Sequence, residues 1–191
     1  MSTLPKLKIS AGPFVFEGQL ETELAPLTCA AFMKLLPYRQ KVIHVRWSGE
    51  GVWVPLGDEH FDLKYENHTS YPAPGQMILY PGGISECEIL LAYGGVHFSS
   101  KLGQLAGNHF ITLTSNLTQL PALGKMVLWQ GAQDILIELA RMLTNQSHND
   151  RIAHAVTLQR ESIIGFLREL IAQTQHGEAA VQNVIAVAYA K

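Results

Sequence analysis

The sequence predicts a mainly β protein with added α-helices, arranged as a closed or nearly closed β-barrel. Three observations predict this fold class. Short segments that alternate like strands are separated by turns rich in proline and glycine. One segment near the start of the chain and another near its end carry apolar residues at helical spacing instead. Of the 191 residues, 47% are hydrophobic and 16% are charged, so the chain can bury a substantial core.

The N-terminal part of the chain is expected to contain strands around one helix. Residues 7–20 predict two short strands with turns beside them. Residues 21–36 predict a helix, in which Pro26 fits the first turn and Pro37 ends the helical pattern. A segment that alternates like a strand and has unusual side chains follows at residues 41–55, with a hairpin turn predicted at residues 48–51.

The next part of the chain is expected to hold short strands separated by turns, at residues 76–80, 86–93 and 109–114. Two helices are predicted after them, at residues 132–143 and 152–173, and the tail at residues 181–189 fits a strand or a helix. We therefore expect a barrel domain over residues 1–145. A C-terminal helical extension over residues 146–191 is expected to pack on the barrel or on a partner subunit.

The composition argues against several classes of partner. The formal net charge of -2 and the lack of basic tracts give no reason to expect nucleic acid binding. No signal peptide and no run of about 18 apolar residues are present, so we expect a cytoplasmic protein that does not bind membranes. Cys29 and Cys87 are expected to be reduced core thiols, because two cysteines are too few for a disulfide framework or a cysteine zinc site. The low charge and the apolar stripe of residues 152–173 favour a homodimer or a larger homo-oligomer.

The segment 41–55 carries the strongest functional signal, because a histidine, an arginine and two tryptophans stand where a core strand usually has aliphatic residues. With a period of two, His44 and Arg46 share one face and Trp47 lies on the other. Arg46 is then a carboxylate anchor, and His44 is a base or a donor. The alternatives are an arginine paired with a surface acid and a structural histidine. Trp47 and Trp53 fit either the wall of a pocket or a core.

Seven short motifs occur in an order and spacing typical of one family. They are Ala25–Cys29, His44–Gly49, Glu66–Asn67, Pro72–Gly75, Tyr80–Gly83, Ala92–Gly94 and Trp129–Ala132. From about residue 7 to residue 139, the chain resembles a bacterial family of cyclophilin-like proteins that long had no assigned function. Opine synthases of the cucumopine and mikimopine type are similar to this family in fold. The resemblance implies a cyclophilin-like barrel and an enzyme that condenses histidine with 2-oxoglutarate by Pictet–Spengler ring closure, without a cofactor.

Such a condensation requires groups that move protons and groups that hold carboxylates. As catalytic residues we expect His44, Glu66, Tyr80 and Tyr93. As substrate-binding residues we expect Arg46, Trp47, Trp53, Asn67, His97, Lys101 and His109. No metal is expected, because the histidines lack carboxylates at ligand spacing. No dinucleotide is expected, because the chain has no glycine-rich phosphate motif.

Other interpretations of these residues stay open. Glu66 and Asn67 could hold their loop through hydrogen bonds from side chain to backbone, and Tyr80 and Tyr93 could be packing residues. A barrel with an arginine equally suits a non-catalytic binder of a small acidic metabolite or peptide. A relative of the prolyl isomerases is the third interpretation, although the aromatic and glutamine residues that line a proline pocket are not recognisable.

Overall fold

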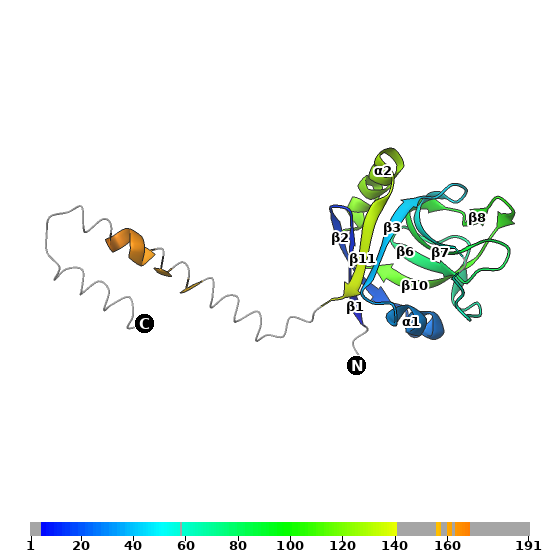
Figure 1. Ribbon diagram of the computed structural model, residues 1–191, viewed down its shortest axis with the longest axis horizontal. Helices are drawn as coiled ribbons and strands as arrows, with labels where there is room; N and C mark the ends of the chain where they lie inside the picture. Colours follow the sequence, from blue (N-terminus) through cyan, green and yellow to red (C-terminus); the bar gives the residue numbers. More distant parts are fainter. Residues whose placement is uncertain (1–4, 58, 141–155, 158–159, 162, 169–191) are drawn as a thin grey trace. The chain divides into compact units, whose positions relative to one another are not determined.

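The structure is a computed structural model that describes residues 5–57, 59–140, 156–157, 160–161 and 163–168 (Figure 1). This part of the chain is mainly β, with a closed barrel and a few helices, which confirms the predicted fold class. The strands are β1 (Lys6–Ala11), β2 (Phe14–Leu20), β3 (Tyr38–His44), β4 (Gly49–Gly57), β5 (His68–Thr69), β6 (Gln76–Tyr80), β7 (Cys87–Val96), β8 (Ser99–Ser100), β9 (Gly103–Gln104), β10 (Gly107–Leu113) and β11 (Gln133–Leu139). The helices are α1 (Pro26–Met33), the short 3-10 helix η1 (Leu117–Gln119) and α2 (Leu120–Gln130).

Eight antiparallel strands close the barrel in the order β2-β1-β11-β3-β4-β7-β6-β10, and β10 pairs with β2 to complete the ring. The short strand β5 adds to β10, and β8 pairs with β9 in a separate hairpin. Closure leaves the barrel itself without open edge strands.

Apolar side chains from all eight barrel strands and from both α-helices fill the interior of the barrel. Figure 1 shows α1 and α2 at opposite ends of the barrel. From α1, Cys29 and Phe32 are fully buried, and Leu123 and Val127 enter the same core from α2. Cys29 and Cys87 are buried and unpaired, as the sequence predicts.

A second apolar cluster covers the outer face of β4, β6 and β7. Strand alternation directs Leu91 into the barrel and directs Glu88 and Leu90 outward. The segment between β7 and β10 folds over this outer face, where Phe98 and Leu105 are buried. This segment therefore shields part of the outer wall of the barrel from water.

Residues 133–139 form strand β11, not the helix predicted over residues 132–143. Ile135 and Ile137 alternate into the core, and β11 pairs with both β1 and β3, so pairing with neighbouring strands decides the structure here. The helix lies earlier in the chain, as α2. Its buried residues have helical spacing, at Leu120, Leu123, Gly124 and Val127.

The chain divides into two compact units, residues 1–140 and 141–191. In the second unit the described residues are helical and fall within the helix predicted over residues 152–173. The rest of that helix and the tail at residues 181–189 lie outside the described residues. How the extension packs stays a prediction. In the part of the chain that the structure describes, every helix is too short or too polar to cross a membrane.

Candidate functional site

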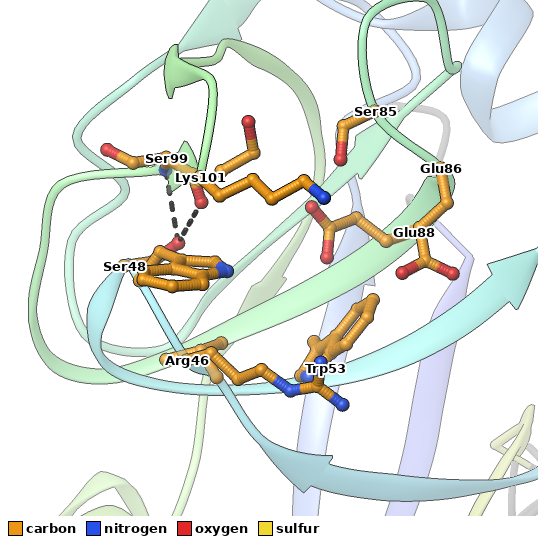
Figure 2. Close-up of a pocket in the computed structure, with 11 residues that line it drawn as sticks. Arg46, Ser48, Trp53, Ser85, Glu86, Glu88, Ser99 and Lys101 are labelled. Atoms are coloured by element: carbon orange, nitrogen blue, oxygen red, sulfur yellow. Dashed lines mark hydrogen bonds between the residues drawn. The ribbon is translucent and has the colours of Figure 1, made fainter.

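A pocket of about 210 Å³ lies on the shielded outer wall of the barrel (Figure 2). Residues 45–48 form one wall, and residues 99–101 of the β8–β9 hairpin form another. Trp53 of β4 lines it as well, together with Glu86, which directly precedes β7, and Glu88 near the start of β7. The pocket thus brings together charged side chains that are far apart in the sequence.

The first wall forms because β3 ends at His44. The chain then turns, and the Val45 N–H donates a hydrogen bond to the carbonyl oxygen of Gly51 at 3.1 Å. Val45, Arg46 and Trp47 all line the pocket, although consecutive residues of a strand would face opposite sides. Because strand alternation ends with β3 at His44, the next residues need not alternate, and Arg46 lies on the outer wall with Val45 and Trp47.

Ser48 joins the two walls of the pocket. Its hydroxyl donates to the carbonyl oxygen of Ser99 at 3.1 Å and accepts from the Ser99 N–H at 3.1 Å. The His97 N–H donates to the carbonyl oxygen of Ser48 at 3.0 Å. The next residue, Gly49, has φ +91°, and a Cβ there would lie 2.6 Å from the carbonyl oxygen of Gly95. Only glycine fits this turn without strain.

Glu88 is the buried acid of the pocket, with only 8% of its surface exposed. It pairs with Pro55 and Tyr80 of the neighbouring strands, and its side chain has no hydrogen bond or ion pair within the described residues. Burial, and then the nearby Glu86 carboxylate, raises the pKa of Glu88 to about 8. At neutral pH this side chain therefore mostly carries its proton.

Two cationic side chains, Arg46 and Lys101, line the same pocket and are exposed to solvent. Neither forms an ion pair within 4.0 Å of any carboxylate in the described ranges. Figure 2 shows the Glu88 carboxyl group and the Lys101 ammonium group pointing into the same space. With Glu88 neutral and Glu86 ionised, the pocket has a net positive charge, which favours an anionic ligand.

Two tryptophans complete the pocket in different ways. Trp53 is 8% exposed and belongs to the outer apolar cluster, whereas Trp47 is 59% exposed. The Trp53 indole N–H is buried and has no hydrogen-bond partner within the described residues. Both rings offer flat apolar surface beside the charged groups, which suits a ligand with an apolar or aromatic part.

Four of the predicted substrate-binding residues meet in this pocket: Arg46, Trp47, Trp53 and Lys101. His44 does not line it, so the expectation that His44 and Arg46 face a common space is wrong. The physical reason is the end of β3 at His44, after which strand alternation no longer applies.

His44 instead pairs with Tyr93 on the inner side of the sheet. The Tyr93 hydroxyl donates to His44 Nε2 at 2.8 Å, and His44 Nδ1–H donates to the carbonyl oxygen of Val45 at 2.7 Å, an arrangement that fits the neutral imidazole. A Cβ on Gly124 of α2 would lie 2.4 Å from the Tyr93 ring, so the helix packs closely over it. Burial, and then the Glu50 carboxylate, raises the pKa of the Tyr93 hydroxyl.

The Glu66 side chain contacts the N-terminal end of α1, and Glu66 does not line the pocket. Its carboxylate accepts from the Thr28 N–H, and its own N–H donates to Asn108 Oδ1 at 3.1 Å. The Asn108 amide donates in turn to Thr28 Oγ1 and to the carbonyl oxygen of Lys64, each at 3.0 Å. These contacts hold the loop before β5 against α1 and β10. They fit the interpretation in which Glu66 holds its loop through hydrogen bonds from side chain to backbone.

Asn67 and His109 belong to the same region. Asn67 has φ +45°, and its amide donates to the carbonyl oxygen of His109 at 2.9 Å. His109 Nε2 contacts Thr112 Oγ1 at 2.9 Å, and the Thr112 hydroxyl donates to the Glu21 carboxylate. Burial lowers the pKa of His109, while Glu21 acts in the opposite direction. Neither Asn67 nor His109 lines the pocket.

His97 and Tyr80 lie near the pocket without lining it. His97 stacks on Tyr71 with ring centroids 4.9 Å apart, and its Nε2–H donates to Gln104 Oε1 at 3.1 Å. Tyr80 is 2% exposed and packs edge-on against Phe98 at 5.8 Å. Both residues therefore support the hairpin over the outer wall.

Glu88 is the residue that sequence reasoning missed. It belongs to the predicted strand 86–93, in which every residue from 89 to 93 is apolar or aromatic. A carboxylate among such residues was the available signal, because strands bury charged side chains rarely and usually with a partner. The other walls of the pocket around Glu88 come from distant segments of the chain, residues 45–48 and 99–101.

A larger, shallower hollow of about 650 Å³ lies over β1, β3 and β11. Its Lys41 is already paired with Asp134 at 2.7 Å, and its charged side chains are exposed. Without a buried acid it is the weaker candidate. Within the described residues, no group of three or more His, Cys, Asp and Glu side chains could hold a metal ion.

Comparison with known proteins gives the family of the chain. The model of a family described as "Protein of unknown function (DUF3830)" matches residues 7–139. The chain belongs to this family. The matched residues include the whole barrel from β1 to β11 except its first residue, and therefore the pocket. A search of curated proteins finds no match.

Solved structures show the fold in other proteins. The structure of McbB in complex with tryptophan is 14% identical, with a TM-score of 0.56, over 72% of this chain and 46% of McbB. This chain thus spans less than half of McbB. A hypothetical protein from Archaeoglobus fulgidus is 18% identical over 72% of this chain and 95% of its own, with a TM-score of 0.48. A cyclophilin-type peptidyl-prolyl cis-trans isomerase from Cryptosporidium parvum is 14% identical over 72% and 99%, with a TM-score of 0.45. The predicted kinship with opine synthases stays a prediction.

Proposed function

We propose that this protein is a small-molecule enzyme that joins the amine of an amino acid to a 2-oxo acid and closes a ring in a Pictet–Spengler reaction. The observation that carries the proposal is the pocket itself, in which the buried acid Glu88, whose pKa is raised to about 8, lies with Arg46 and Lys101, two cations that form no ion pair within the described residues. A group with a pKa near the working pH can both give and take a proton.

Glu88 has the properties that each proton transfer of this reaction requires. The amine adds to the carbonyl carbon, and one amine proton passes to the carbonyl oxygen to give a carbinolamine. The neutral Glu88 carboxyl then donates its proton to the carbinol oxygen, which leaves as water. An aromatic carbon of the amine substrate then attacks the resulting iminium. The ionised Glu88 removes the proton from that ring carbon and returns to its starting state. One carboxyl group thus acts first as an acid and then as a base, and its protonation state is the same at the end as at the start.

The other lining residues would bind and orient the substrates. Arg46 and Lys101 can pair with the carboxylates of the two substrates, and the guanidinium of Arg46 can do so with two hydrogen bonds. Trp47 and Trp53 can contact the aromatic ring of the amine. The structure of McbB in complex with tryptophan supports an aromatic amino acid as the amine for this fold.

A non-catalytic binder of a small acidic metabolite is the second candidate. The pocket of about 210 Å³ favours it, because ligand pockets usually measure roughly 300–1,000 Å³ and a smaller one holds a single small acid more readily than two substrates. The open side at Trp47, which is 59% exposed, is where a second substrate would have to extend.

Product formation separates the two candidates. The protein is incubated with histidine or tryptophan and with 2-oxoglutarate or pyruvate, and mass spectrometry follows the condensed product. We expect product well above the uncatalysed rate, and a fall of about 100- to 10,000-fold in the Glu88→Gln variant, because the amide cannot transfer protons. Ser85→Ala, which removes a pocket hydroxyl without a hydrogen bond in the described structure, is the matched control and should retain activity.

Two results would contradict this proposal. Unchanged turnover in Glu88→Gln would remove Glu88 from the chemistry. The absence of product with every pair of substrates, while 2-oxo acids still bind, would favour the binder.

A further inference from the structure

The Glu88 side chain lines the pocket, and its carboxyl group has no hydrogen-bond partner among the described residues. The residue as a whole is more than nine-tenths buried, and no cation of the described residues forms an ion pair with it. A buried carboxyl group without such partners retains its proton, because nothing compensates the desolvation of its charge. The retained O–H is a strong donor that has no acceptor among the described residues.

We infer that this pocket binds small carboxylates through a hydrogen bond from the neutral carboxyl group of Glu88 to the ligand carboxylate, with Arg46 and Lys101 supplying the positive charge. The ligand therefore binds together with one proton, which Glu88 holds. This inference rests on the proposed function only in locating the ligand in this pocket. It holds for an enzyme and for a binder alike.

The charged groups that line the pocket with Glu88 come from separate segments of the chain. Arg46 comes from the loop after β3, Lys101 from the β8–β9 hairpin, and the acidic neighbour is Glu86. The adjoining Cys87 thiol donates to the carbonyl oxygen of Tyr80 at 3.0 Å, and burial raises its pKa to about 11, so it stays neutral over the relevant range.

The balance of charge changes when Glu88 ionises. Below its pKa the two cations face one carboxylate, Glu86, and the pocket attracts an anion. Above the pKa a second carboxylate appears inside the pocket, where it repels the ligand and competes for Arg46 and Lys101. Affinity for a carboxylate must then fall as pH rises, with Glu88 as the titrating group.

Glutarate is a suitable probe, because it has two carboxylates and no carbonyl group with which to react. Calorimetry measures its dissociation constant between about pH 6 and about pH 9.5. In the wild type we expect constant affinity at low pH and a loss of about tenfold per pH unit above the pKa of Glu88. In that upper range, heats measured in two buffers of different ionisation enthalpy should show uptake of up to one proton per ligand.

Variants identify the group responsible. Glu88→Gln keeps a donor but does not titrate, so its affinity should be independent of pH. Glu88→Leu has no donor and should bind about ten- to a hundredfold more weakly at neutral pH. The matched control Glu86→Gln should bind more tightly and should keep a pH dependence, whose midpoint moves to lower pH because the Glu86 carboxylate helps to raise the pKa of Glu88. Lys101→Arg should also keep the pH dependence, because an arginine side chain does not titrate in this range.

Several outcomes would overturn the inference: wild-type affinity that stays constant to about pH 9.5, a pH dependence that persists in Glu88→Gln, or no glutarate binding at any pH. Failure of the proposed function is distinct from these. Binding of glutarate with the expected pH dependence but without condensed product would contradict the enzyme and leave this inference standing. Product formation with pH-independent glutarate binding would contradict only the inference.

Discussion

Glu88 occupies a position on β7 where an apolar side chain would be expected to make the protein more stable. Leu90 and Ala92 share its face of the strand and are fully buried, and the carboxyl group finds no donor within the described residues. Burial of an unpaired carboxyl group is costly. Such a cost beside unpaired cations is typical of a functional position, although it is also found in structural networks.

The pH dependence of stability should reveal that cost. The pKa of Glu88 is about 8 in the folded protein, against about 4.5 for an unperturbed side chain. Between these values the folded state binds more protons than the unfolded state, so Glu88 lowers the free energy of unfolding as pH rises. We expect Glu88→Gln to be more stable than the wild type by an amount that grows across this range and reaches the order of 2–4 kcal/mol near its upper end. Urea unfolding of both proteins at several pH values measures the difference; a difference that is constant with pH would contradict the raised pKa.

The pocket depends on two connecting segments, the loop after β3 and the β8–β9 hairpin, which Ser48 joins. Hydrogen bonds of one hydroxyl to both the N–H and the carbonyl oxygen of Ser99 fix the distance between the walls that carry Arg46 and Lys101. The elements of the barrel supply a rigid support, while these segments supply most of the charges.

Replacement of Ser48 tests this role. Ser48→Ala leaves both backbone groups of Ser99 without their side-chain partner, and should lower the free energy of unfolding by about 1–3 kcal/mol. Because only the backbone bond from His97 to the Ser48 carbonyl oxygen then joins the walls at Ser48 in the described structure, we also expect weaker glutarate binding at neutral pH. Ser85→Ala is the matched control, since its hydroxyl lines the same pocket without a hydrogen bond in the described structure. Equal affinities for the two variants would show that Ser48 does not organise the pocket.

For the molecule as a whole, local sequence patterns predict the barrel better than they predict the site. Alternation and proline-glycine turns locate most barrel strands, and residue type alone points to Arg46 and Lys101. The apolar run at residues 135–137 fits either a strand or a helix, and only its pairing with β1 and β3 decides. The apolar run after Glu88 was a local signal of its burial, but the cations that line the pocket with it come from distant segments, residues 45–48 and 99–101. The predicted homo-oligomer stays a prediction, since the structure describes a single chain.

Direct titration of Glu88 tests most directly whether the barrel holds a proton-bearing acid in this pocket. Carbon NMR of the glutamate side-chain carboxyl groups, with the Glu88 signal assigned through Glu88→Gln, follows its ionisation in the free protein. We predict a midpoint near 8. A midpoint near the ordinary value of 4.5 would show that Glu88 is ionised at neutral pH, for example through an ion pair with Lys101, and would contradict both the acid–base role and the binding mode.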